Sequence, residues 1–214
     1  MLGGITLASV YDLKPRFQAM LRPLTGGLAS KGVSANMVTI AAAALSIVTG
    51  LLILWLGEKP IWLLLLPACL FVRMALNAID GMLAREHGQK SALGALLNEL
   101  GDVVSDAALY LPLAIVLVPF GMTPALAVLF VVTALLSEFA GVAALMVGAE
   151  RVYDGPMGKS DRAASIGFVA AYLGLGFAGG WWVDLTFAIL IILCIVTVGN
   201  RMRAALAWAK DNNA

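Results

Sequence analysis

Apolar residues dominate six stretches of the chain, and short polar connections rich in Gly and Pro separate them. A helix that crosses a bilayer needs about 20 mostly apolar residues, and each stretch is roughly that long. The pattern therefore predicts an all-α protein with six membrane-spanning helices. They are expected at residues 35–56, 61–84, 92–118, 124–148, 163–180 and 183–205.

The segment before the first apolar stretch has a different pattern. Residues 11–22 mix basic and apolar groups, which is typical of an amphipathic helix in the membrane interface. A basic and partly ordered tail explains the same residues equally well. We divide the chain into an N-terminal segment, residues 1–30, and a six-helix membrane domain, residues 31–214.

Composition supports a membrane protein and excludes several other classes. Hydrophobic residues make up 61% of the chain and charged residues 13%, whereas roughly a quarter of an ordinary soluble domain is charged. A net charge of +1 argues against nucleic-acid binding. Cys69 and Cys194 both lie in apolar runs, which suggests neither a disulfide framework nor a metal cluster.

The distribution of Lys and Arg predicts the orientation. Of the 14 such residues, twelve fall in the N-terminal segment, the tail and alternate loops, while Lys59 is alone on the opposite side and Arg73 lies within the second span. Because basic loops remain in the cytoplasm, both termini are expected there. We expect a multi-pass protein of a bacterial inner membrane.

Polar residues interrupt two neighbouring spans at their cytoplasmic ends. Asn77 and Asp80 share one face of the second span, and Asn98, Asp102 and Asp106 stand four apart on the third. Each ionisable residue within a span costs at least ~2.5–3.5 kcal/mol, so it needs a partner or a function. A short turn makes the spans antiparallel neighbours, so these faces can meet. Hard oxygen ligands of this kind favour Mg²⁺, Mn²⁺ or Ca²⁺, although interhelical hydrogen bonds alone are an alternative, above all for Asp106.

These polar residues belong to a longer run of fixed spacing. Asp80-Gly81-Met82-Leu83-Ala84-Arg85 is followed after eight residues by Gly94, and then, each time after three residues, by Asn98 and Asp102. The run resembles the signature of the CDP-alcohol phosphotransferase family, Asp-x-x-Asp-Gly-x-x-Ala-Arg, eight residues, Gly-x-x-x-Asp-x-x-x-Asp. The six-span layout and the entry to the first span are also similar to the family, so the resemblance covers most of the chain.

The resemblance implies a transferase that moves a substituted phosphate from a CDP-linked donor to an alcohol and releases CMP. It implies that Asp102 is the general base and that Asp80 and Asp102 bind Mg²⁺ or Mn²⁺ with Asn77 and Asn98. It also implies a homodimer. The residues that it places at the nucleotide are Gly81, Ala84, Arg85, Asn36 and Thr39.

The chain departs from the family signature at Asn77 and Asn98, where the family has its first and third aspartates. An amide offers one neutral oxygen where a carboxylate offers a charged and bridging one. The number of metal ions at the site, one or two, is therefore open. Asp106 and Glu99 are candidate compensating carboxylates. The chain is then an active single-metal enzyme, an enzyme with re-routed ligands, or a member that binds donor but turns over poorly.

Basic residues before the fifth span suggest an acceptor site. Lys159 and Arg162 are three apart and share a helix face, an arrangement that suits a phosphate or acidic group. The alternative is that these basic residues only keep their loop on the cytoplasmic side of the membrane. Arg73 is expected to form an ion pair with Asp106 or Glu138.

Three functions follow in order of preference. The first is phosphatidyl transfer from CDP-diacylglycerol to a polar alcohol, with membrane lipids as partners. The second uses a soluble CDP-alcohol with diacylglycerol as acceptor, and the third is a catalytically silent lipid-binding protein. A transporter is disfavoured because the sequence lacks broken half-helices and inverted repeats.

Overall fold

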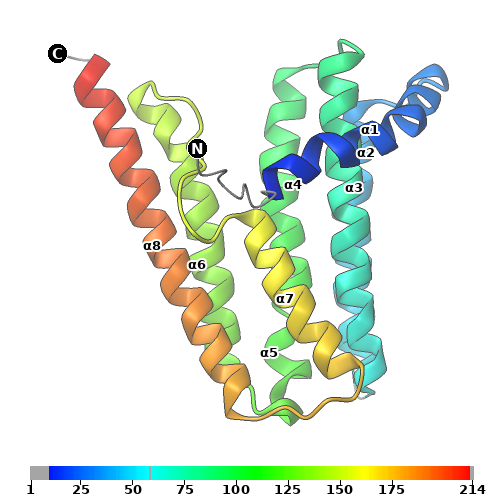
Figure 1. Ribbon diagram of the computed structural model, residues 1–214, viewed down its shortest axis with the longest axis vertical. Coiled ribbons are helices and arrows are strands. Elements are labelled where there is room, and N and C mark those ends of the chain that lie inside the picture. Colours follow the sequence, from blue (N-terminus) through cyan, green and yellow to red (C-terminus); the bar gives the residue numbers. More distant parts are fainter. Residues whose placement is uncertain (1–9, 58, 213–214) are drawn as a thin grey trace, which may run out of the picture.

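The computed structural model describes residues 10–57 and 59–212, and all regular structure in these ranges is helical (Figure 1). The elements, in order, are α1 (Val10–Ser30), α2 (Ala35–Leu56), η1 (Pro60–Leu64), α3 (Leu65–Glu86), α4 (Ala92–Tyr110), α5 (Leu113–Val116), η2 (Val118–Phe120), α6 (Pro124–Ala143), η3 (Ala144–Val147), α7 (Lys159–Gly174) and α8 (Trp181–Asn212).

Four helical segments are long and apolar enough to cross a membrane, so the chain is a membrane protein. They are Ala35–Leu56, Pro60–Glu86, Pro124–Val147 and Trp181–Asn212. The other two expected spans differ from these. The α4 helix carries three acidic residues, and α7 has 16 residues, about 24 Å of helix against a hydrocarbon core of about 30 Å. Six spans therefore remain a prediction.

Two of the expected spans form shorter helices than predicted, and the helix expected at 183–205 continues to Asn212. The stretch expected at 92–118 is one helix only to Tyr110, because Pro112 has no amide hydrogen to continue the hydrogen-bond pattern. The helix expected at 163–180 is α7, which begins at Lys159. It begins early because Asp161 Oδ2 accepts from the Gly158 amide at 3.0 Å, and it ends before Gly176, whose φ is +91°.

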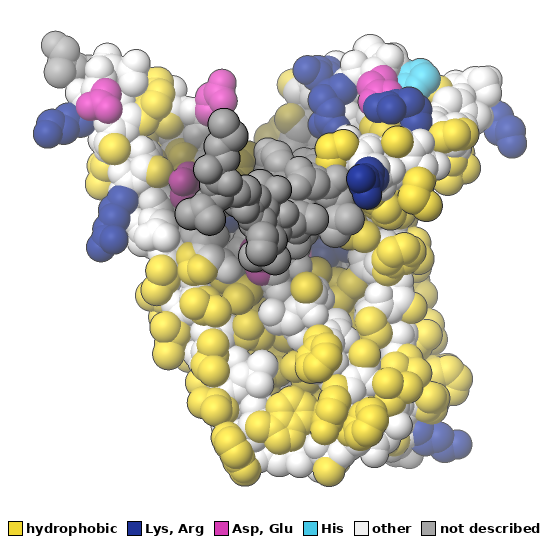
Figure 2. All heavy atoms as spheres, viewed as in Figure 1, with side chains coloured by type: hydrophobic (Ala, Val, Ile, Leu, Met, Phe, Trp, Pro, Cys, Tyr) yellow, Lys and Arg dark blue, Asp and Glu magenta, His cyan; other side chains and the backbone are white. Residues whose placement is uncertain are grey.

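The helices form a bundle in which α2 packs against α3 and α4, and α6 packs against α8. Aromatic rings of Tyr110, Phe130 and Phe187 connect α4, α6 and α8 in the core, with successive centroids 5.6 and 5.5 Å apart. Hydrophobic side chains cover the lower part of the face seen in Figure 2, and charged side chains gather at the upper end. This distribution matches a molecule with an apolar belt.

The N-terminal helix is longer than the sequence pattern predicts. Helix α1 runs to Ser30 and lies across α3 near the upper end of the bundle (Figure 1). Leu21, Leu28 and Ala29 pack against the small core formed by α2 and α3, and Arg22 Nε lies 2.9 Å from Glu86 Oε2. Its position in a membrane interface stays a prediction, and residues 1–9 lie outside the described part.

The connection between α6 and α7 does not stay at the upper end of the bundle. It descends beside α6 and α8, so α7 begins well below the top of the molecule (Figure 1). The Val152 amide donates to Gly141 O at 3.1 Å, and the Met157 amide donates to Thr197 Oγ1 at 3.0 Å. These bonds hold residues 149–158, the descending loop, against α6 and α8.

Candidate functional site

The first signature aspartate retained in this chain, Asp80, is buried on α3. Its Oδ2 accepts from Thr39 Oγ1 on α2 at 2.8 Å. The start of α2 is fixed locally, because the Ser34 hydroxyl accepts from Met37 N and the Ala35 amide donates to Gln89 Oε1 at 2.7 Å. Thr39, expected at the nucleotide, is therefore also a direct partner of Asp80.

The second retained aspartate, Asp102, lies on α4 and is also buried. Its Oδ1 accepts from the ammonium of Lys159, the first residue of α7. Arg73 Nη2 lies 3.3 Å from the same oxygen and donates to the Asp102 backbone oxygen at 3.2 Å. Arg73 of α3, Asp102 of α4 and Lys159 of α7 thus bring three helices together at one polar site.

The expected amide ligands, Asn77 and Asn98, are half-buried and stand one turn before Asp80 and Asp102 on their helices. Within residues 10–57 and 59–212, no three His, Cys, Asp or Glu side chains come together as a metal site. The set of oxygen donors expected from the sequence is two carboxylates and two amides. Such a set fits one hard divalent ion, Mg²⁺ or Mn²⁺, and lacks the charge that two would require.

The expected nucleotide residues lie beside close helix contacts. A Cβ at Gly81 would lie 2.9 Å from Arg85 Nη2, so the Arg85 guanidinium covers that glycine. A Cβ at Gly94 would lie 2.8 Å from Asn36 Oδ1, so Asn36 of α2 sits directly over α4. Ala84, in contrast, packs against the small core between α2 and α3.

A second set of charges lies deeper in the bundle. Asp106 Oδ1 pairs with Arg73 Nη1 at 2.6 Å, and its Oδ2 pairs with Arg162 Nη2 at 2.9 Å. The expected ion pair between Arg73 and Asp106 is confirmed. Because guanidiniums engage both of its oxygens, Asp106 is better placed as an ionic partner than as a compensating metal ligand.

Arg162 lies apart from the place expected for an acceptor-binding residue. Its side chain is fully buried. Nη2 pairs with Glu138 Oε1 at 2.8 Å as well as with Asp106, and Nη1 donates to Ser137 Oγ and to Met157 O. These contacts favour a structural role, and Lys159 alone of the two basic residues reaches the polar site.

Sequence reasoning missed the extent of this network on its α6 side. Glu138 Oε2 pairs with Arg151 Nη2 at 2.7 Å, and its Oε1 lies 3.6 Å from Arg201 Nη1. Arg151 also pairs with Glu99 Oε2 at 3.0 Å. Partial burial lowers the pKa of the Arg151 guanidinium, but its hydrogen bond to Tyr153 and the nearby carboxylates outweigh burial and raise it. The sequence did contain a signal for this part of the network, because Ser137 and Glu138 are polar residues within an apolar span.

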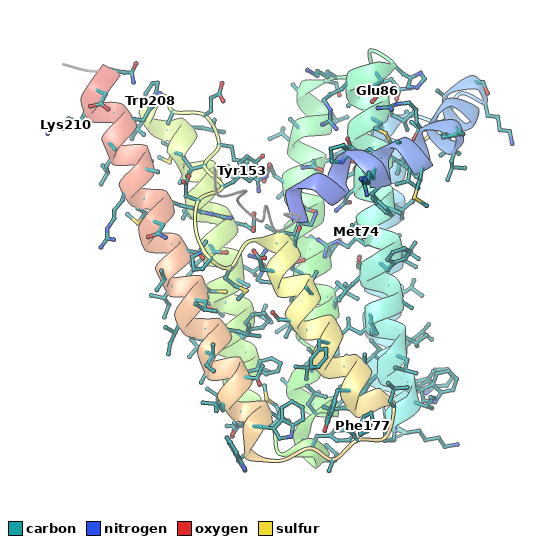
Figure 3. All side chains as sticks on the ribbon, viewed as in Figure 1. Met74, Glu86, Tyr153, Phe177, Trp208 and Lys210 are labelled. Carbon is teal, nitrogen blue, oxygen red and sulfur yellow. The ribbon has the colours of Figure 1, made fainter. Side chains whose placement is uncertain are left out.

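Charged side chains gather at one end of the molecule (Figure 2). Figure 2 shows that end hollowed between two raised parts. Glu86 lies at this end on one side, and Trp208 and Lys210 lie there on the other (Figure 3). Tyr153, in the descending loop, lies between them, while Phe177 lies at the opposite end (Figure 3).

Three comparisons bear on the identity of the chain. Residues 33–208 match the family model of CDP-alcohol phosphatidyltransferase. The chain is 46% identical over 203 residues to the inner membrane protein YnbA of Escherichia coli (strain K12), covering 95% of this chain and 99% of that protein.

Solved structures of a Mycobacterium tuberculosis phosphatidylinositol phosphate synthase (PgsA1) share the fold. The structure with CDP-DAG bound has a TM-score of 0.72 at 21% identity, and covers 86% of this chain and 92% of that one. The complex with manganese and citrate has the same TM-score and identity, and covers 86% and 88%. The family model spans most of the chain, including Asp80 and Asp102, and the chain therefore belongs to the CDP-alcohol phosphatidyltransferase family.

Proposed function

We propose that this protein transfers a phosphatidyl group from CDP-diacylglycerol to a polar alcohol and releases CMP. The observation that carries the proposal is the burial of two aspartates within an apolar bundle, Asp80 on α3 and Asp102 on α4, whose helices both pack against α2. The Mycobacterium tuberculosis neighbour, which shares this fold, was solved with CDP-DAG, and this supports the choice of donor.

Asp80 and Asp102, with the amide oxygens of Asn77 and Asn98, would hold one Mg²⁺ or Mn²⁺. A bound divalent ion neutralises charge that develops on the donor pyrophosphate. Thr39 orients Asp80 through its 2.8 Å hydrogen bond. Gly81, Ala84, Arg85 and Asn36 are assigned to the cytidine diphosphate.

Asp102 is assigned as the general base. Among the described residues, its carboxylate is contacted through Oδ1, by Lys159 and Arg73, so Oδ2 is the oxygen left for an incoming hydroxyl. The acceptor oxygen forms a bond to the phosphatidyl phosphorus, the bond from that phosphorus to CMP breaks, and the acceptor proton passes to Asp102. Arg73 holds the carboxylate in place during this step.

Lys159 is assigned to the acceptor side, because its ammonium lies at the polar site and its side chain is 29% exposed. A cation there favours an acceptor that carries an acidic group. We further propose six spans, both termini in the cytoplasm of a bacterium, insertion in its inner membrane and a homodimer. The membrane assignment is supported by the inner-membrane relative.

Release of labelled CMP tests this function. Purified protein with Mg²⁺ or Mn²⁺ should release CMP from CDP-diacylglycerol when phosphorylated and unphosphorylated polyols are supplied. Asp102→Asn should lower the rate by at least about 100-fold, as expected for loss of a general base. Asp184→Asn is the matched control, because Asp184 contacts Thr123 at the opposite end of the bundle.

Two other outcomes would contradict the proposal. Donor binding without CMP release for any acceptor would identify a silent family member, which the asparagines at 77 and 98 would explain. Release of CMP from a soluble CDP-alcohol in the presence of diacylglycerol, and not from CDP-diacylglycerol, would reverse the roles of donor and acceptor.

A further inference from the structure

The buried charges around the polar site balance one another. In the part of the chain that the structure describes, four buried carboxylates line this region, and three buried guanidiniums and one ammonium pair with them or lie beside them. The carboxylates are Asp80, Asp102, Asp106 and Glu138, and the cations are Arg73, Arg162, Arg201 and Lys159. An added divalent cation would leave this region with two uncompensated positive charges.

Lys159 differs from the other three cations. The guanidiniums of Arg73, Arg162 and Arg201 are at most 4% exposed and each is fixed by several acceptors. The Lys159 side chain is 29% exposed, and its ammonium contacts Asp102 alone among the described side chains. Because its ammonium is flexible and has one partner, Lys159 is the cation of this set that can move away from its carboxylate.

The place that Lys159 occupies is the place where a metal is expected. Its ammonium binds Oδ1 of Asp102, an expected metal ligand. Asn77 and Asn98, the other expected ligands, would add oxygen atoms but no negative charge. A divalent cation must therefore compete with an ammonium for a site that holds only two carboxylates.

A pyrophosphate changes this balance because it brings about two negative charges of its own. Its oxygens would bind the divalent cation directly and would also attract the released ammonium. We propose that Lys159 is an internal counter-ion that competes with the divalent cation for Asp102, so that metal binds tightly only together with a pyrophosphate-bearing nucleotide. The inference rests on the proposed function for the nature of that nucleotide, and it predicts coupled rather than independent binding.

Titration of the full-length protein with Mn²⁺, with free Mn²⁺ followed by electron paramagnetic resonance, tests the coupling directly. The wild-type protein is measured alone, with CDP and with CMP, and each titration is corrected for the Mn²⁺ that the same nucleotide binds without protein. We expect Mn²⁺ affinity to rise at least about tenfold with CDP and by much less with CMP, within the range usual for coupled sites. Equal affinity with and without CDP would overturn the proposal, and this comparison requires no variant.

Variants assign the coupling to Lys159. Lys159→Met keeps an unbranched stem and removes the charge, so its Mn²⁺ affinity without nucleotide should rise about tenfold and the effect of CDP should shrink. Lys159→Arg should behave like wild type. Lys210→Met, at an exposed residue of α8, is the matched control and should change nothing. Unchanged Mn²⁺ binding by a folded Lys159→Met protein would refute the role of Lys159.

The Mn²⁺ titration and the CMP-release assay test two separate claims, so either claim can be refuted without the other. Coupled Mn²⁺ binding without CMP release would leave the role of Lys159 standing and refute the transferase. CMP release together with Mn²⁺ binding that is independent of CDP would support the transferase and refute the role of Lys159.

Discussion

Arg162 is fully buried, and both of its terminal nitrogens have acceptors on other elements. Nη2 lies between Asp106 of α4 and Glu138 of α6, and Nη1 between Ser137 of α6 and Met157 of the descending loop. The planar guanidinium can reach four acceptors at once, which an ammonium cannot do with the same geometry. At this residue, three separate segments meet on one side chain.

Arg162→Met is therefore expected to destabilise the protein. Removing one partner from a buried ionic network typically costs about 3–5 kcal/mol, because the remaining charges lose their compensation. The midpoint of thermal unfolding in detergent should fall strongly for Arg162→Met and less for Arg162→Lys. The control is Arg203→Met, at an exposed residue of α8. An unchanged midpoint with a raised acceptor KM would instead support the acceptor-binding role predicted from sequence.

The same residues show what sequence could predict about the site. The spacing of Asp80 and Asp102 and the cost of an arginine within a span were enough to predict a polar site and to name Asp106 or Glu138 as the partner of Arg73, and the structure shows Asp106. The role of Arg162 was not predicted, because its spacing from Lys159 matches an acceptor site equally well. One turn of α7 separates the two side chains, so Lys159 reaches Asp102 while Arg162 reaches Asp106 and Glu138.

At the scale of elements, the approach of α2 to α4 controls where Asn36 lies. A methyl group on Gly94 would meet Asn36 Oδ1 at 2.8 Å. Gly94→Ala should therefore displace the Asn36 side chain, with strain of about 1 kcal/mol or more, and raise the KM for the CDP donor about fivefold.

Gly199→Ala is the matched control, because a Cβ at Gly199 of α8 would have no heavy atom within 4 Å. Steady-state kinetics of CMP release at saturating acceptor would measure both variants. Equal KM values for Gly94→Ala and wild type would show that Asn36 does not contact the nucleotide.

Helix positions were predicted better than helix ends. Hydropathy located the six helical stretches, because apolar residues fill each of them. It misplaced α7, which begins at Lys159 and ends at Gly174. Its start is set by a local cap from Asp161 and its end by a glycine with positive φ. Neither signal changes the average hydropathy of a window of about 20 residues.

At the scale of the whole molecule, the orientation can be tested by labelling. Single cysteines would replace the exposed residues Lys59, Lys90 and Lys210. With both termini in the cytoplasm and basic loops retained there, a membrane-impermeant maleimide should label only the cysteine at position 59 in cells with a permeabilised outer membrane. Cys69 and Cys194 are buried, so they should contribute little background.

Labelling after disruption of the inner membrane is the control, and all three positions should then react. Reaction at position 90 or 210 in cells with an intact inner membrane would contradict the predicted orientation. Reaction at position 59 together with position 210 would contradict an even number of spans.

The network around Arg162 also has a consequence for biogenesis. A translocon releases helices into lipid one or a few at a time, and an arginine in a helix opposes release, by ~2.5–3.5 kcal/mol at the helix centre and by less near its ends. Helix α7 is short and carries Arg162 in its first turn, so its entry into lipid is more favourable once Asp106 and Glu138 are in place to receive it. Helices α4 and α6 precede α7 in the chain. The order of synthesis thus delivers the two carboxylates to the membrane before the arginine that they neutralise.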